Sequence, residues 1–281
     1  MEFMEASGPF LLRDPAAPLA HCRLSYTTVP FAGGGVRLAD IAFRTFKEVD
    51  LVGGTVIEAI PSVGLVSTIA ATYMLTNLPV DQVCALDSED FPPLSMVYKY
   101  RPKFPVRIYA DAKSKLSIFI AEVPLPPRVH RDLALALLHW ATTHRCRQIV
   151  CLEGLPLPLD ERPKDVMVWG VGSTDSARKT LDDAKIRQLE TGMISGVSGV
   201  LLNEGRWQFY DVITLLAEAR VAIPDANAAA KLLETVDTLL PEIQLNLDPL
   251  KEEAKALEAH LSKLRAEAQP AISDTSSGMF R

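Results

Sequence analysis

Thr55-Val-Ile-Glu-Ala-Ile-Pro-Ser-Val-Gly64 and the apolar stretch from Leu65 to Leu78 decide the fold class. The first six residues, rich in apolar and β-branched side chains, are typical of a strand. Pro61 and Gly64 indicate a turn. The apolar residues at positions 66, 69, 70, 73 and 74 have the spacing of one helix face. The stretch therefore predicts a strand, a turn and a helix in succession.

Working outward from this unit, strands and helices alternate along the chain. Further strands are expected at 106–110, 116–123, 148–152, 166–171 and 212–218, and helices at 131–144 and after Asp225, the expected N-cap residue. Such alternation predicts an α/β fold, with a mixed or largely parallel sheet covered by helices on both faces. Residues 1–50 show only a glycine turn at 33–35 and no consistent periodicity.

The segment after residue 240 has a different pattern. Leucine or alanine recurs at steps of three and four residues, at Leu247, Leu250, Ala254, Leu257, Leu261 and Leu264. This heptad spacing predicts a helical or coiled-coil extension over 241–268, beyond an α/β domain spanning 1–240. The helix either lies on the core of its own chain or contacts another chain. The second reading makes an oligomer seam of Leu250, Leu257, Leu261 and Leu264.

The C-terminal residues 269–281 are expected to form a mobile tail. Residues 269–278 are small, polar and turn-rich, as in a flexible linker. The chain nevertheless ends in Met279, Phe280 and Arg281, and the two large apolar side chains have no local partner. Unless this ending is accidental, it predicts a ligand for a pocket elsewhere.

Bulk composition excludes several classes of function. The 281 residues are 48% hydrophobic and 23% charged, which is ordinary for a globular protein. A net charge of -6 and scattered basic residues argue against nucleic-acid binding. The chain lacks an apolar run of about 18 residues, so no membrane-spanning helix is expected, and its acidic start does not fit a secretory signal. Four scattered cysteines indicate reduced thiols in a cytoplasmic protein.

Two glycine-containing segments were considered as sites. Gly170-Val-Gly-Ser-Thr174 follows a strand, but it matches neither a dinucleotide fingerprint nor a P-loop, and a turn capped by Ser173 or Thr174 is favoured. Gly196-Val-Ser-Gly199 lacks the spacing of a nucleophile elbow. Small residues over 192–199 would let another element pack closely. The periodicity leaves open whether 193–203 is helix or strand.

Titratable residues form no catalytic or metal-binding pattern. His130, His139 and His144 lack ligand spacing, and Cys146 and Cys151 are too isolated for a metal pair. Carboxylates at strand ends can act as acids, but a structural role is favoured for Glu58, Glu122 and Glu153. We therefore expect no catalytic residue, no metal and no cofactor.

Several stretches, taken in order, resemble the proteasome assembly chaperone 2 family over roughly residues 55–265. They are Ile60-Pro-Ser-Val-Gly-Leu-Val-Ser-Thr-Ile-Ala-Ala71, Asp90-Phe-Pro-Pro93, Ala121-Glu-Val-Pro124, Leu152-Glu-Gly-Leu-Pro156, Gly196-Val-Ser-Gly-Val-Leu-Leu202, Leu215-Leu-Ala-Glu-Ala219 and Pro224-Asp-Ala-Asn-Ala-Ala-Ala230. The resemblance implies a three-layer α/β sandwich similar to nucleoside phosphorylases, usually without recognisable catalytic residues. It also implies self-association.

In archaeal assembly factors, the resemblance implies binding to proteasome α subunits through a C-terminal hydrophobic–Tyr–any-residue motif. Met279, Phe280 and Arg281 occupy those three places here. Phe280 in place of Tyr keeps the ring but loses a hydroxyl hydrogen bond, worth about 0.5–1.5 kcal/mol net.

The expected function is therefore that of a non-enzymatic, homo-oligomeric protein-binding factor, either a proteasome assembly chaperone or a ring-binding protein. Its expected partner is the proteasome α-subunit ring or a similar ring assembly. An alternative is an enzyme or binder of a small molecule, with a nucleoside-phosphorylase-like fold and a cleft at the carboxyl edge of the sheet. A purely structural oligomer is a third possibility.

Overall fold

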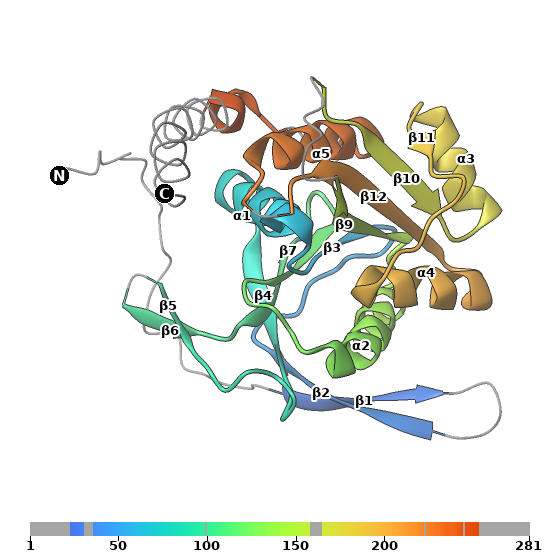
Figure 1. Ribbon diagram of the computed structural model, residues 1–281. Coiled ribbons are helices and arrows are strands. Elements are labelled where there is room, and N and C mark those ends of the chain that lie inside the picture. The colour runs from blue at the N-terminus through green and yellow to red at the C-terminus, as the bar shows by residue number, and fades with distance from the viewer. Residues whose placement is uncertain are drawn as a thin grey trace, which may run out of the picture.

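The computed structural model describes residues 23–30 and 36–252, except residues 99, 158–164, 222 and 244. Figure 1 shows the arrangement of its helices and strands. In chain order the elements are β1 (Arg23–Pro30), β2 (Val36–Thr45), β3 (Thr55–Ala59), η1 (Val63–Leu65), α1 (Val66–Asn77), β4 (Asp81–Asp87), β5 (Met96–Tyr98), β6 (Arg101–Lys103), β7 (Val106–Asp111), β8 (Leu116–Ala121), η2 (Pro127–Val129), α2 (His130–Thr143), β9 (Gln148–Pro156), β10 (Val168–Gly172), α3 (Asp175–Asp183), β11 (Arg187–Gln188), α4 (Gly196–Gln208), β12 (Asp211–Ala219) and α5 (Ala226–Leu239).

A ten-stranded sheet in the order β1-β2-β4-β7-β8-β3-β9-β12-β10-β11 organises the described residues. The strands at its centre, β8, β3, β9 and β12, are parallel to one another. The flanking strands β1, β2, β4 and β7 pair antiparallel, as β10 does with β12. The expected mixed sheet is therefore confirmed, with its parallel pairing concentrated in the middle.

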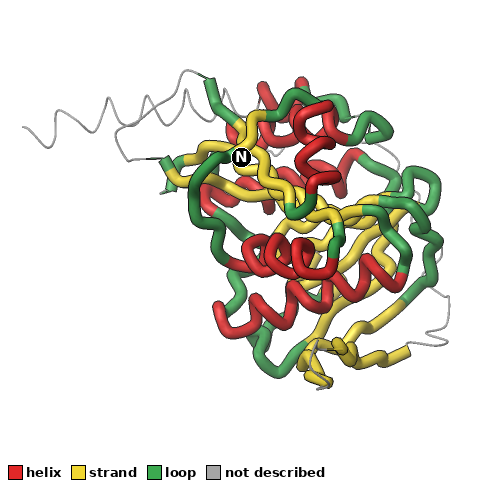
Figure 2. The backbone as a smooth tube through the Cα atoms, turned by 90° about the vertical axis from the view of Figure 1, so that its right-hand side faces the viewer, coloured by secondary structure: helices red, strands yellow, loops and turns green. Residues whose placement is uncertain are grey.

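Helices cover both faces of this sheet. Side chains of α1, α3 and α5 pack on one face, in a core that includes Ile57, Ile118 and Leu215. Side chains of α2 and α4 pack on the other face, against Val56, Phe119 and related residues. Figure 2 shows helices on the two sides of the strands. The three-layer arrangement confirms the expected fold class. None of the described helices is long and apolar enough to cross a membrane.

The strand–turn–helix unit has the predicted form. Its turn places Gly64 at φ 63° and Leu65 at φ 51°, both in the left-handed region. A Cβ on Gly64 would lie 3.0 Å from the Arg220 carbonyl oxygen, so this position favours glycine for both reasons. The Asp225 N–H donates to the Gly64 carbonyl (2.8 Å), and the Asp225 carboxylate accepts from the Ala228 N–H (3.2 Å). Asp225 is therefore the N-cap of α5, as predicted.

Several elements differ from or extend the sequence-based expectations. Strands β1, β2, β4 and the small β5–β6 hairpin were not predicted. Strand β9 continues to Pro156, beyond its expected end at residue 152. The undecided segment at 193–203 contains the start of helix α4, which runs from Gly196 to Gln208.

The first turns after α5 pack on the chain's own core. Leu247 and Leu250 are buried in the same cluster as α5. Lys251 also forms an ion pair with Glu234 of α5, with an N–O distance of 2.6 Å. The described residues thus join this part of the 241–268 extension to the α/β domain. Residues 253–281 lie outside the described residues.

Candidate functional site

Three polar side chains meet at the carboxyl edge of the parallel strands, where ligands bind in many open α/β sheets. Glu58 lies on β3, Glu153 on β9 and Ser198 in the first turn of α4. The Ser198 hydroxyl lies 2.9 Å from Glu58 Oε2 and 2.6 Å from Glu153 Oε1. Because the hydroxyl has one hydrogen, both contacts are satisfied together when one carboxyl group is protonated and donates to Ser198 Oγ.

The neighbouring backbone encloses this cluster. The Ile60 N–H donates to Glu58 Oε1 (3.0 Å), and the Gly154 N–H donates to the Ser62 hydroxyl (3.2 Å). A Cβ on Gly154 would lie 2.2 Å from the Val63 carbonyl oxygen, so the loop after β3 can approach strand β9 only because residue 154 is glycine. This close approach lies beside the two carboxyl groups, Glu58 on β3 and Glu153 on β9.

Burial controls the ionisation of the cluster. It raises the pKa of Glu58 from its ordinary value of 4.5 to about 7. Burial, with the neighbouring Glu58 charge, raises the pKa of Glu153 to about 8. Burial also raises the pKa of the adjacent Cys151 thiol, which therefore stays protonated near neutral pH. The two carboxyl groups thus retain a shared proton at neutral pH.

This arrangement joins helix α4 to the sheet but offers little access to a substrate. A hydroxyl between two carboxyl groups could in principle be an activated nucleophile. However, Glu58 and Ser198 are 0% exposed, and Glu58, Glu153 and Ser198 do not line the groove found beside α4. Within the described ranges, no cluster of three or more His, Cys, Asp or Glu residues could hold a metal ion. Glu153 is partly exposed, so the geometry is that of a largely buried polar contact between strands and helix.

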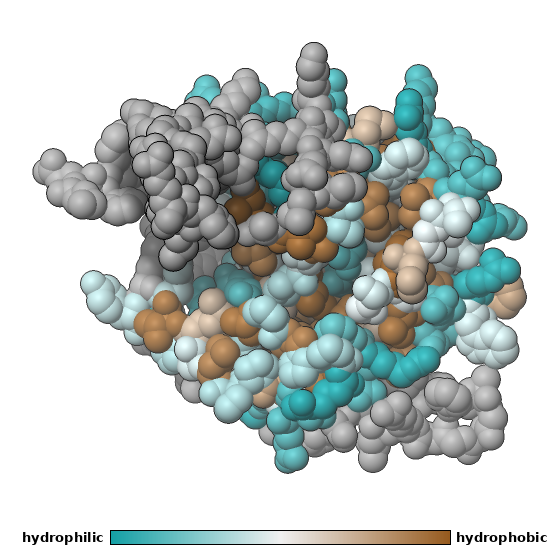
Figure 3. Space-filling model, viewed as in Figure 1, coloured by the Kyte–Doolittle hydropathy of each residue, from teal (hydrophilic) through white to brown (hydrophobic). Residues whose placement is uncertain are grey.

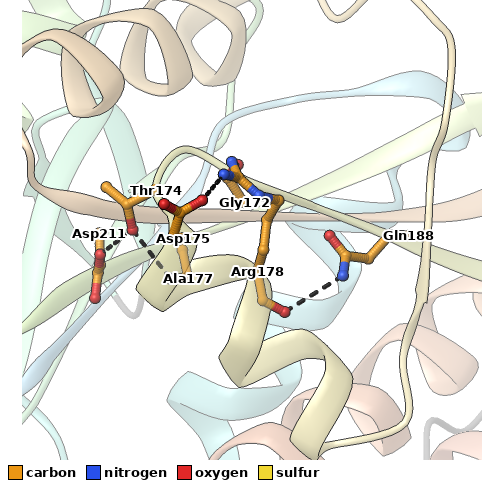
Figure 4. A network of polar contacts seen from close by, with 7 residues as sticks. All are labelled: Gly172, Thr174, Asp175, Ala177, Arg178, Gln188 and Asp211. Carbon is orange, nitrogen blue, oxygen red and sulfur yellow. Dashed lines mark hydrogen bonds and ion pairs between the residues drawn. The ribbon is translucent and has the colours of Figure 1, made fainter.

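A shallow groove of about 340 Å³ lies near the end of β10, beside α4. Its lining includes Gly172, Ser173, Gly199, Asn203 and Arg206. Figure 4 shows the adjoining turn into α3, where residue 174 caps the helix. The Thr174 hydroxyl donates to Asp211 and accepts from the Ala177 N–H (3.0 Å).

The glycine-containing turn before α3 is therefore the capped strand-to-helix turn that was favoured. A Cβ on Gly172 would lie 2.7 Å from the Arg178 backbone nitrogen, so the missing side chain permits close packing within the chain. Arg178 pairs with Asp175, and its carbonyl accepts from Gln188 Nε2 (3.3 Å; Figure 4). These contacts stabilise the turn from inside the molecule.

The other polar residues considered from the sequence have structural neighbours. Glu122 forms an ion pair with the buried Arg107. His130 Nε2 lies 3.1 Å from the Leu125 carbonyl oxygen. The ring of His144 stacks on Trp140 with a centroid separation of 3.9 Å. Cys146 and Cys151 are free and buried, as expected for reduced thiols in the core.

The residues proposed to bind partners lie largely outside the described part of the chain. Met279, Phe280 and Arg281 fall there, as do Leu257, Leu261 and Leu264 of the oligomer seam. Leu250 is described and is 4% exposed, packed within its own chain. Docking through the tail and association through the seam therefore stay predictions.

Glu58 and Glu153 were candidate residues from the sequence, but their shared partner, the Ser198 hydroxyl, was not. Ser198 is 140 and 45 positions away from them in sequence, and no local pattern reports contacts at that separation. The β5–β6 hairpin also escaped notice. Apolar residues and charged residues alternate only from Tyr98 to Lys103, and the three consecutive apolar residues Met96, Val97 and Tyr98 obscure this signal.

Comparison with known proteins places this architecture in a family. The model of the PAC2 family matches residues 56–265. An uncharacterized protein of Methanocaldococcus jannaschii, MJ0106, is 27% identical over 211 residues, which cover 74% of this chain and 84% of that protein.

Two solved structures from Pyrococcus furiosus share the fold. PbaA, an archaeal homolog of proteasome-assembly chaperone, is 27% identical with a TM-score of 0.73, and the match covers 85% of this chain and 97% of that one. PbaB, an archaeal proteasome activator, is 23% identical with a TM-score of 0.70, covering 81% and 99%. The family model spans most of the chain, and the chain belongs to the PAC2 family.

Proposed function

We propose that this chain is a non-enzymatic protein-binding factor that acts on the proteasome, as an assembly chaperone or a ring-binding protein. The observation that carries the proposal is the likeness to PbaA, which extends over 97% of that protein at 27% identity. The largely buried contact among Glu58, Glu153 and Ser198 supports a binding role over a catalytic one, because Glu58 and the Ser198 hydroxyl are 0% exposed.

Docking is assigned to the C-terminal tail. Burying Met279 and Phe280 in pockets of an α-subunit ring would contribute roughly 1.5–3 kcal/mol each. Ordering the tail and losing translational freedom oppose this gain by several kcal/mol. One tail alone is therefore expected to bind at about millimolar strength, which corresponds to roughly 4 kcal/mol.

Useful affinity then requires several tails acting together. Each additional tail binds at a high effective concentration once the first has bound. The linker over 269–278 would let a tail search a span somewhat under about 20 Å. The proposal thus includes a homo-oligomer that presents several tails to one ring.

The oligomer is assigned to the heptad extension. Because Leu250 is buried within its own chain, intermolecular contacts have to come mainly from Leu257, Leu261 and Leu264. A cytoplasmic site of action follows from the proposed partner. It agrees with Cys84, Cys146 and Cys151 being buried and free of disulfides.

The test compares the intact protein with three variants for binding to a purified proteasome α-subunit ring, measured by biolayer interferometry. Deleting residues 279–281 should abolish binding without changing oligomer size. Deleting residues 276–278 removes the same length from the linker and should preserve most binding. Phe280→Tyr should strengthen binding about two- to tenfold, because it restores a hydroxyl hydrogen bond.

Full binding by the protein lacking residues 279–281 would refute the role of the tail. Tight binding by a monomer would refute the argument from several tails. If the intact protein does not bind the ring, but nucleosides or small carboxylates raise its melting temperature, the small-molecule alternative is favoured instead. In that case the groove lined by Asn203 and Arg206 would be the first place to look.

A further inference from the structure

The β5–β6 hairpin concentrates exposed apolar side chains in a short segment. Four of the eleven large hydrophobic residues exposed in the described structure lie between positions 94 and 100. They include Val97, which is 74% exposed, and Tyr100, which is fully exposed. Figure 1 shows the hairpin standing away from the body as a separate small sheet, and Figure 3 shows apolar residues gathered in the same region.

The exposed side chains of this hairpin contribute little to the chain's own core. Val97 and Tyr100 take no part in the two clusters that flank the large sheet. Tyr100 also has φ 64°, in the left-handed region that a bulky residue seldom adopts. A small isolated hairpin is only marginally stable in water. Exposed aromatic residues in such an element indicate a surface that meets another molecule.

One contact within the hairpin and another beside its base fix its position. Lys103 Nζ lies 4.8 Å above the centre of the Tyr98 ring. Arg44 of β2 lies 5.4 Å from the centre of the Phe104 ring and pairs with Asp87 of β4 at 2.6 Å. The hairpin is thus connected to the antiparallel side of the large sheet. A preorganised arm of this kind loses little conformational freedom on binding.

The same segment is basic in an acidic protein. Residues 91–110 contain Lys99, Arg101, Lys103 and Arg107 and no Asp or Glu, whereas the whole chain has a net charge of -6. Arg107 is neutralised by Glu122. Arg101 is exposed and has no ion pair with any described residue. The outer end of the hairpin therefore combines apolar rings with an uncompensated positive charge.

We propose that the β5–β6 hairpin docks against an acidic, partly apolar surface of another protein. Tyr98 and Arg101 are cross-strand partners on one face of the hairpin, and Val97 lies on the other face. The partner therefore surrounds the outer end of the hairpin, where Arg101 meets a carboxylate while Val97 and Tyr100 bury their apolar surface. A protein fits this surface better than a nucleic acid, because the aliphatic side chains of Val97 and Leu94 make no favourable contact with phosphate groups. The proposal does not depend on the proteasome.

The probe is a fluorescein-labelled random copolymer of glutamate and tyrosine, and binding to the full-length protein is followed by fluorescence anisotropy. The double variant Tyr100→Ser with Arg101→Glu should bind about tenfold or more weakly. Val97→Thr, which keeps every charge, should weaken binding by a smaller factor. The control Arg187→Glu makes the same charge change on β11, at the far edge of the sheet, and should stay within about twofold of the parent.

Two further measurements localise and classify the contact. The copolymer should slow hydrogen exchange of the amides in residues 94–103 more than elsewhere. A polyglutamate of the same length should bind more weakly, because it lacks rings for Val97 and Tyr100 to contact. The proposal is overturned if the double variant binds like the Arg187→Glu control, if protection appears only outside 94–103, or if an oligothymidylate binds better than the copolymer.

Discussion

Replacing Glu58 by Gln tests the shared proton at the carboxyl edge of the sheet. The amide has nearly the shape of the carboxyl group, so packing around β3 is retained. It never ionises, and it leaves Glu153 without a like-charged neighbour. The variant therefore removes a titrating group while leaving the surrounding contacts with Ser198 and the Ile60 N–H geometrically possible.

The direction of the pH effect follows from the raised pKa. The folded protein holds the Glu58 proton up to about pH 7, whereas an unfolded chain releases it near the ordinary value of 4.5. Stability from this group is therefore complete below about pH 4.5 and is lost as pH rises to about 7. Glu153 extends the loss to about pH 8. The free energy of unfolding should fall between pH 5 and pH 8.5.

The size of the effect is a few kcal/mol. A tenfold change in proton affinity corresponds to about 1.4 kcal/mol, so raising the pKa of the buried Glu58 from 4.5 to about 7 corresponds to roughly 3 kcal/mol. Between about pH 5 and pH 8.5, Glu58→Gln should therefore lose roughly 2–3 kcal/mol less stability than the parent. When the free energy of unfolding of each protein is taken relative to its own value at low pH, that of the variant should be higher than that of the parent in alkaline buffer.

Urea unfolding followed by far-ultraviolet circular dichroism measures this difference at several pH values. Glu48→Gln is the matched control, because it makes the same chemical change at an exposed carboxylate outside the buried cluster. His139 has a pKa lowered by burial, but it contributes equally to all three proteins. Identical pH dependence in Glu58→Gln and the parent would refute the shared proton.

Two other predictions concern packing and association. Gly154→Ala should destabilise the fold by about 1–3 kcal/mol or more, measured by urea unfolding, because its Cβ would lie 2.2 Å from the Val63 carbonyl oxygen; an unchanged midpoint would contradict this. Leu257→Asp should dissociate the oligomer in sedimentation velocity while the domain stays folded, because an unpaired carboxylate is strongly unfavourable in an apolar seam. An unchanged oligomer would contradict the seam, and global unfolding would place this helix on its own core.

Local sequence patterns predicted the central part of the fold well. The strand and helix on either side of Gly64 form where periodicity places them, and Asp225 caps α5 as its position before an apolar helix face indicates. These features depend on nearest neighbours along the chain, so a window of a few residues contains the needed information. The order of motifs also led to the correct family.

The antiparallel strands at the sheet margin were harder to predict. Strands β2 and β4 pair with each other, and their stability depends on partners distant in sequence. The same limit applies to the small β5–β6 hairpin, whose exposed apolar residues break the usual alternation of buried and exposed positions. Tertiary pairing decides such elements more than intrinsic propensity does.

The sequence by itself determined an α/β chain with a mixed or largely parallel sheet, a capped helix after Asp225, and carboxylates within or at the ends of strands. Only the tertiary structure decided that Glu58 and Glu153 share the hydroxyl of Ser198, that Leu250 packs on its own chain, and that an aromatic, basic hairpin stands free of the core. Helices and strands follow from local periodicity. Burial and the shared proton depend on which distant segments the folded chain brings within a few ångströms.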